Sequence, residues 1–208
     1  FEVAWHLAPL NRALGSLTLD ALVLAGLTAA IQAQEVSIPD TGLNAAVRET
    51  LGKPTGPLTE QDMLSLTNLS AISRNITNLH GLEAARNLST LLLDDNHITD
   101  VSFPDVLTNM TRLGVLDLSE NIITNLTVPN GLTNLIKLRA ENGRLARLTL
   151  PAAGLVGLTN LSLGFNQLSS LIVPAEMTNL SVLSLFQNQL TNLALPPTLT
   201  SLSLLLCR

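Results

Sequence analysis

The sequence predicts a mostly β fold, a solenoid in which short parallel strands stack turn upon turn behind a small N-terminal helical cap. Two observations support this prediction. First, 46% of the 208 residues are hydrophobic and only 2% are aromatic, and leucine alone supplies nearly a quarter of the chain. Second, one spacing of leucines recurs from Leu66 to the end of the chain. Such a strong bias toward one aliphatic residue is typical of repeat proteins and membrane spans.

Charge and cysteine content exclude several classes of function. The net charge of −5 and the pI near 5.1 argue against a nucleic-acid binder or an anionic-membrane binder. A single cysteine excludes an internal disulfide framework and a multi-thiolate zinc site. The three histidines, His6, His80 and His97, are scattered along the chain. We therefore expect no metal site and no cofactor.

The composition of residues 1–34 indicates either a signal-peptide-like segment or an N-terminal helical segment. The apolar stretch 21–31 has the length of a signal-peptide core, and Arg12 precedes it. Asp20 interrupts the longer apolar region, which disfavours a membrane anchor. A secretory signal is the preferred interpretation, so no membrane span is expected in the mature form. An N-terminal helix packed on the body is the alternative.

The pattern of apolar and capping residues in 35–65 predicts the helical cap. Apolar residues from Leu43 to Leu51 follow helical spacing, and Gly52 ends the segment. Thr59 and Asp62 have the spacing of a capping box that opens a second short helix. Two small helices with apolar faces can cover the exposed end of a repeat array, which such arrays need for solubility.

The leucine spacing in residues 66–208 predicts the repeat array itself. The pattern L-x-x-L-x-L-x-x-N/C-x-L recurs at intervals of 19 to 25 residues, with copies that begin at Leu88, Leu113, Leu135, Leu158, Leu180 and Leu199. This pattern identifies leucine-rich repeats. Alternation along each strand points the leucines inward and the x residues outward. Because no repeat can bury its leucines alone, neighbouring turns must stack.

The N/C position of the pattern predicts a ladder of inward side chains. Their amides would bond backbone groups that the strand ends leave unsatisfied. The predicted ladder residues are Asn96, Asn121, Asn166, Asn188 and Cys207. Cys207 is interpreted as a buried structural thiol. Gly143 interrupts the ladder and predicts a locally weakened turn.

A second motif, a short alternating segment stopped by a proline, predicts the convex side of the solenoid. It ends at Pro104, Pro129, Pro151, Pro174 and Pro196. Proline lacks the donor that a strand needs to continue its ladder. Because only about a dozen residues separate each proline from the next strand, we expect short extended or 3₁₀ segments and no long helix.

The stretch from Leu66 to Leu88 resembles the cap-to-first-repeat junction of bacterial internalin-like leucine-rich repeat proteins. The segments Ile38-Pro39-Asp40 and Thr59 to Met63 resemble the helical cap of that group, and the resemblance covers residues 36–206. The proline-ended convex motif departs from the helical convex side of the best-known internalins. It is similar to the LTSLTLP-type repeats of predicted secreted proteins of environmental bacteria. The resemblance implies a secreted or cell-surface bacterial binding domain without catalysis. It does not indicate which ligand this chain binds.

The outward x positions predict a ligand-binding site on the concave face. Early repeats place acidic side chains beside two cations, and later repeats place two phenylalanines together. The candidate residues are Asp117, Lys137, Arg139, Glu141, Phe165 and Phe186. Clustered exposed aromatics are typical of binding hot spots. The alternatives are a solvated charged face and a phenylalanine pair that only stacks across strands.

The function that these patterns favour is a non-catalytic extracellular recognition domain that binds a protein or a peptide, or alternatively a glycan. A second hypothesis is a structural spacer or stalk segment of a larger bacterial surface protein. An enzyme is disfavoured because no pocket of convergent titratable groups is evident. Leu204, Leu205 and Leu206 would leave an open apolar edge, so we expect the array to be truncated at its C-terminus.

Overall fold

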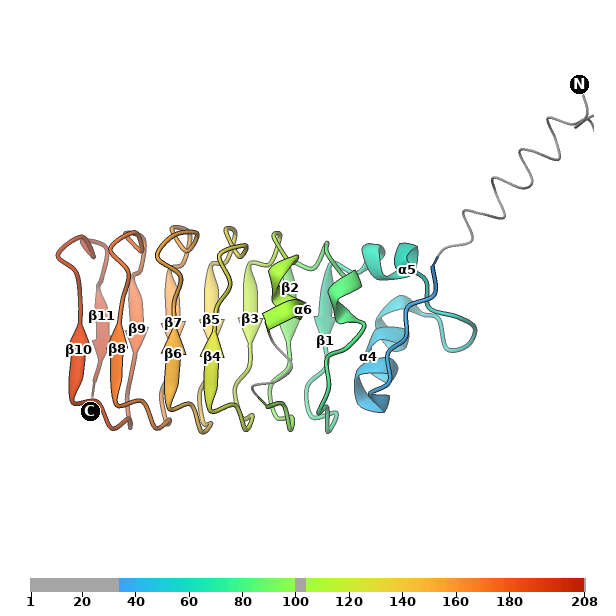
Figure 1. The fold of residues 1–208 in the computed structure, drawn as a ribbon, viewed down its shortest axis with the longest axis horizontal. Helices are drawn as coiled ribbons and strands as arrows, with labels where there is room; N and C mark the ends of the chain where they lie inside the picture. The colour runs from blue at the N-terminus through green and yellow to red at the C-terminus, as the bar shows by residue number, and fades with distance from the viewer. Residues whose placement is uncertain (1–33, 100–103, 208) are drawn as a thin grey trace, which may run out of the picture. The chain divides into compact units, whose positions relative to one another are not determined.

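The computed structural model describes residues 34–99 and 104–207, and it is mostly β (Figure 1). Two helices come first, α4 (Thr41–Leu51) and α5 (Glu60–Ser65). The predictions for residues 1–34 lie outside the described residues, apart from Gln34. No helix within the described part of the chain is long and apolar enough to cross a membrane.

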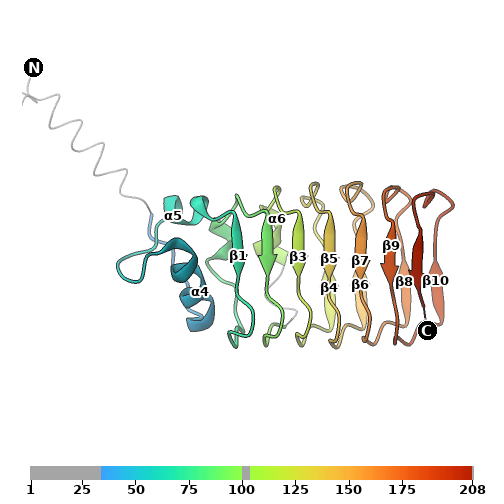
Figure 2. The same ribbon diagram turned by 180° about the vertical axis from the view of Figure 1, so that it is seen from behind.

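A seven-stranded parallel sheet forms one side of the solenoid (Figure 2). Each strand has three residues, and the leucines at their centres align from Leu69 in the first strand to Leu205 in the last. All of these central leucines are buried except Leu205, which is exposed. This sheet corresponds to the predicted concave side. In order across the sheet, its strands are β1 (Asn68–Ser70), β2 (Thr90–Leu92), β3 (Val115–Asp117), β5 (Lys137–Arg139), β7 (Asn160–Ser162), β9 (Val182–Ser184) and β11 (Leu204–Leu206).

The opposite side carries short segments of three kinds (Figure 1). The first turns have the 3₁₀ helix η1 (Leu82–Ala84) and the five-residue α6 (Pro104–Thr108), and the later turns have extended segments. Those segments pair as two separate parallel sheets, β4 (Asn125–Thr127) with β6 (Arg147–Thr149), and β8 (Ser170–Ile172) with β10 (Asn192–Ala194). The extended prediction is therefore confirmed for these four segments. The segment that ends at Pro104 falls on residues 101–103, which lie outside the described residues, and Pro104 itself begins α6, a position that its fixed φ favours.

Inward leucines, isoleucines and methionines form one continuous core between the two sides. The core runs from Ile38, just before α4, to Leu185 in the later turns. Each turn buries its leucines only against its neighbours, as the repeat pattern predicts.

The cap forms where the sequence predicts it. Gly52 ends α4 in the left-handed conformation, with φ of 61°. Thr59 and Asp62 make the reciprocal bonds of a capping box at the start of α5. Asp40 begins α4 by accepting a bond from the Leu43 amide, and its second oxygen accepts from the Thr77 amide in the first turn of the array. This carboxylate therefore joins the cap to the repeats.

Asparagine side chains bond successive turns at the end of each strand. Asn121 accepts a bond from the Ile98 amide of the preceding turn at 2.9 Å. Its Nδ2 atom donates to the carbonyl of Leu93 in that turn and to two carbonyls of its own turn. Equivalent bonds are made by Asn96, Asn166 and Asn188.

Gly143 interrupts this ladder, because glycine has no side chain to make the equivalent bonds. In the neighbouring turns, a ladder asparagine accepts from the amides of Ile98 and Leu145. The corresponding amide of Ile123 has no such acceptor, because residue 143 has no side chain. A cavity of about 10 Å³ remains there, and Asn121 and Asn166 are among the residues that line it.

The predicted register of the last repeat is wrong. The repeat copy that begins at Leu199 predicts that Leu202 aligns with Leu183, at a spacing of 19 residues, but the structure pairs Leu205 with Leu183, at a spacing of 22. Cys207 is therefore not at the ladder position of Asn188. It follows β11 where Leu185 follows β9, and its thiol is exposed because no further described turn covers it. Partial burial still raises the pKa of this thiol.

Candidate ligand-binding face

The candidate site is the outward surface of the seven-stranded sheet and of the turns that follow its strands, which we call the sheet face (Figure 2). On each strand, the residues before and after the central leucine point outward. Register places Asp117, Arg139, Ser162 and Ser184 in one row across β3, β5, β7 and β9. Neighbouring parallel strands lie about 4.8 Å apart, so these side chains can contact one another.

Three of the predicted residues form what we call the arginine cluster, Asp117, Arg139 and Glu141. The Nη1 atom of Arg139 lies 3.1 Å from Oδ2 of Asp117, and its Nη2 atom lies 3.1 Å from Oε2 of Glu141. The hydrogen bond to Glu141, and then the charge of Asp117, raise the pKa of Arg139 above its ordinary value. The guanidinium is thereby held in one place and keeps its charge.

Asp117 is the most buried member of this cluster, with 6% of its surface exposed. Its Oδ1 atom accepts a bond from the Ser119 amide, and the Ser119 hydroxyl accepts from the Glu141 amide. Burial, followed by repulsion from Asp117, raises the pKa of the neighbouring Asp94. The cluster is therefore a rigid polar patch with an excess of carboxylates.

Lys137 lies on the same strand as Arg139 but does not join the cluster. Its outward neighbours in register are Val115 and Asn160. It makes no ion pair or side-chain hydrogen bond with any residue that the structure describes.

Phe165 and Phe186, which the sequence predicts to lie together, form an edge-to-face pair. Their ring centroids are 5.4 Å apart and the ring planes meet at 73°. The two residues are 52% and 36% exposed, so the pair presents ring surface to solvent. It lies on the turns that follow β7 and β9.

The backbone of Phe165 is in the left-handed region, with φ of 57°. The residue before the ladder position adopts this conformation throughout the later array, at Asp95, Glu120, Asn142, Phe165 and Gln187. Asparagine and aspartate tolerate it, whereas a bulky side chain there is an outlier. The fold alone does not favour phenylalanine here, and strain of this kind is concentrated at functional sites.

Sequence reasoning missed a groove on the opposite side of the solenoid. It lies over β6 and β8, two neighbouring strands that belong to different sheets. Ile172, which is 72% exposed, lines it together with Arg147 and Glu176. The proline-ended motif predicts extended segments on this side. It does not predict that β6 and β8 belong to different sheets and leave a groove between them.

Within the described residues, no group of three histidine, cysteine, aspartate or glutamate side chains could hold a metal ion. The arginine cluster and the phenylalanine pair are thus the two distinctive features of the sheet face. Both lie on a regular repeat scaffold that fixes their positions.

No protein-family model matches the sequence, and no curated protein does. Solved structures do match. The functional domain of InlJ from Listeria monocytogenes, which includes a cysteine ladder, is 27% identical over 85% of this chain, with a TM-score of 0.72. This chain spans only 38% of the length of that one.

Two further internalins from Listeria monocytogenes share the fold. Internalin C2 is 24% identical, with a TM-score of 0.52, and the match covers 86% of this chain and 98% of that one. InlF is 21% identical, with a TM-score of 0.51, and the match covers 85% and 72% of the two chains. The capped parallel solenoid with its asparagine ladder defines a leucine-rich repeat protein. The chain is, more specifically, an internalin-like leucine-rich repeat protein.

Proposed function

We propose that this chain is a non-catalytic recognition domain that binds a protein or peptide ligand through the sheet face. The observation that carries the proposal is the exposed Phe165–Phe186 pair, in which Phe165 has a left-handed backbone. Aromatic side chains at the centre of an exposed patch contribute a large share of binding energy in protein interfaces. The internalin-like fold supports a bacterial extracellular location, either secreted or on the cell surface.

The ion pairing of the carboxylates supports binding without catalysis. Asp117 and Glu141 are both ion-paired with Arg139 on the open sheet face. A general acid needs a carboxyl group that keeps its proton in a water-excluding site. In the arginine cluster, both carboxylates instead contact a guanidinium on an open face, an arrangement that suits the recognition of a charged partner.

The proposal is tested by selecting a phage-displayed library of random 12-residue peptides on the immobilised 208-residue chain. We expect enriched peptides that bind the wild type and bind the double variant Phe165→Ala/Phe186→Ala at least about 30-fold more weakly. The control is Ile172→Ser, which changes an exposed apolar residue on the opposite side and should leave binding unchanged. Circular dichroism verifies that each variant is folded.

Two outcomes would contradict the proposal. Peptides that bind the double variant as tightly as the wild type would show that the phenylalanine pair is not the site. A selection without any enrichment would favour the alternative, a spacer or stalk whose outward positions bind nothing.

A further inference from the structure

Gly164 leaves a vacant side-chain position in the middle of the sheet face. The residue two places before the ladder position is Asp94, Ser119, Glu141, Gly164 and Phe186 in successive turns. A Cβ atom on Gly164 would lie 3.5 Å from the Phe186 carbonyl, which is ordinary van der Waals contact. Crowding therefore does not require glycine here, and the gap is a local feature of the surface.

Two hydrogen-bond acceptors border this gap. The same Cβ position lies 3.6 Å from the Ser184 hydroxyl and 3.7 Å from Oε1 of Glu141. Arg139 binds the other oxygen of Glu141, Oε2. Neither Oε1 nor the Ser184 hydroxyl has a hydrogen-bond partner among the described residues. The gap thus offers two free acceptors, one of them on a carboxylate.

The phenylalanine pair stands beside the same gap. Phe165 follows Gly164 directly in the chain, and Phe186 occupies on the next turn the position that Gly164 leaves empty. Aromatic ring faces attract cations within about 6 Å of the ring centroid. The planar guanidinium of arginine stacks on such rings and donates several hydrogen bonds at once.

The surrounding charge favours the same kind of ligand. The strands and turns of the sheet face carry more carboxylates than cations, namely Asp94, Asp95, Asp117, Glu120 and Glu141 against Arg74, Lys137, Arg139 and Arg144. Arg74 is paired with Glu49 of α4. Arg139 is already engaged by Asp117 and Glu141. A cationic partner would therefore be drawn to this face, more strongly at low ionic strength.

We infer that the ligand of the sheet face is a basic peptide segment, and that one of its arginine side chains enters the gap over Gly164. The guanidinium donates to Oε1 of Glu141 and to the Ser184 hydroxyl, and its plane lies against the phenylalanine pair. This inference rests on the proposed function and names the chemical class of the partner.

The test compares two synthetic ten-residue peptides that alternate glycine, leucine and a third residue. The third residue is arginine in one peptide and citrulline, its uncharged isostere, in the other. Binding to the full 208-residue chain is measured by fluorescence anisotropy, and the backbone amide signals of Gly164 and Phe186 are followed by NMR. We expect the arginine peptide to shift both signals and to bind at least about tenfold more tightly than the citrulline peptide.

Two variants locate the effect. Glu141→Gln removes the charge but keeps a side chain that can accept from Arg139, and Gly164→Ala places a methyl group in the gap without a clash. Each should weaken the arginine peptide about tenfold. The matched control Glu176→Gln removes the same charge on the opposite side and should have no effect.

Equal affinity for the two peptides would overturn the inference, and so would equal losses for Glu141→Gln and Glu176→Gln. Either result is distinguishable from failure of the proposed function. If phage-selected peptides still depend on the phenylalanine pair but are indifferent to Gly164→Ala, the sheet face binds a ligand of another class. If they do not depend on the phenylalanine pair, the sheet face itself is wrongly assigned.

Discussion

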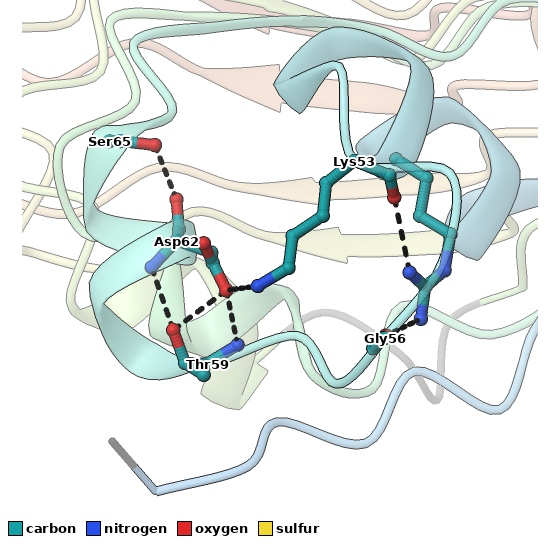
Figure 3. Close-up of polar contacts among 6 residues, drawn as sticks. Lys53, Gly56, Thr59, Asp62 and Ser65 are labelled. Atoms are coloured by element: carbon teal, nitrogen blue, oxygen red, sulfur yellow. Dashed lines mark hydrogen bonds and ion pairs between the residues drawn. The ribbon is translucent and has the colours of Figure 1, made fainter. Parts of the chain in front are cut away.

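The Nζ atom of Lys53 lies 2.6 Å from Oδ2 of Asp62, across the loop that joins the two cap helices (Figure 3). The same oxygen accepts bonds from the amide and the hydroxyl of Thr59. One carboxylate therefore closes the capping box of α5 and fixes the loop that follows α4. The hydrogen bond from Lys53, and then those from Thr59, lower the pKa of Asp62 from 3.8 to about 2.

The first prediction concerns acid stability. Because the pKa of Asp62 is lower in the folded state, its ionised form stabilises the fold above pH 3.8, and this stability is lost as the pH falls from 3.8 to about 2. Asp62→Asn should lower the free energy of unfolding by about 1 kcal/mol at pH 7, the size of a capping interaction. Urea unfolding between pH 2 and pH 7 measures this difference, which should shrink toward pH 2.

Glu60→Gln is the matched control, since Glu60 lies in the first turn of the same helix and has no hydrogen bond or ion pair within the described residues. Its effect at pH 7 should be smaller than that of Asp62→Asn. A constant difference between wild type and Asp62→Asn over the whole pH range would contradict the role of the ionised carboxylate.

The fold could be predicted because its signals are local and repeated. The leucine spacing fixes which residues face inward, and the Thr59–Asp62 pair marks the start of a helix without any tertiary information. The register of the last strand could not be predicted in this way. Between Leu199 and Leu206 leucines stand at five positions, so two alignments satisfy the pattern. The structure takes the one that keeps the 22-residue length of the neighbouring turn.

The candidate site could be predicted in part for the same reason. Strand alternation and register place Asp117 beside Arg139, so a row of outward residues follows from the sequence alone. The vacancy at Gly164 could not be recognised, because it depends on where the side chains of Glu141 and Ser184 lie. The strained backbone of Phe165 also depends on the conformation of the turn, which the leucine pattern does not specify.

The second prediction concerns Asp94, whose pKa changes in the opposite direction. Burial, and then the charge of Asp117, raise it, so the ionised carboxylate destabilises the fold at neutral pH. Asp94→Asn should therefore raise the free energy of unfolding at pH 7, by no more than about 0.5 kcal/mol. The gain should disappear once the pH falls well below 3.8, where the carboxyl group is protonated in both states of the wild type. A loss of stability at pH 7 would show that Asp94 makes a favourable contact instead.

The third prediction concerns the missing rung of the ladder. An asparagine at position 143 would offer an acceptor to the Ile123 amide and fill part of the small cavity. A Cβ atom there would lie 3.0 Å from Oδ1 of Asn166 and 3.3 Å from the carbonyl oxygen of Asn121, so both neighbours must shift by a few tenths of an ångström. We expect Gly143→Asn to stabilise the fold by about 1 kcal/mol, from the new hydrogen bonds and from a less flexible unfolded chain.

Gly143→Ala separates these contributions, because it brings the same Cβ atom without the amide. It should change the free energy of unfolding by less than Gly143→Asn does, as measured by urea denaturation. If the two variants are equally stable, the amide does not join the ladder.

The fourth prediction separates stability from binding at Phe165. Its left-handed backbone costs about 1 kcal/mol or more for a bulky side chain, and asparagine relieves this strain. The lost edge-to-face contact with Phe186 costs about 0.5 to 1.5 kcal/mol. These effects have opposite signs, so Phe165→Asn should change the free energy of unfolding by less than about 1 kcal/mol.

The same variant should lose at least about tenfold in affinity for any peptide that binds the sheet face, because half of the aromatic pair is gone. Phe186→Ala is the comparison, since it removes the same contact without relieving strain at Phe165 and should be the less stable of the two. Thermal unfolding and anisotropy on the same preparations measure both properties. If Phe165→Asn were strongly destabilising while binding was unchanged, the phenylalanine would serve the fold, and the strained conformation would need no functional explanation.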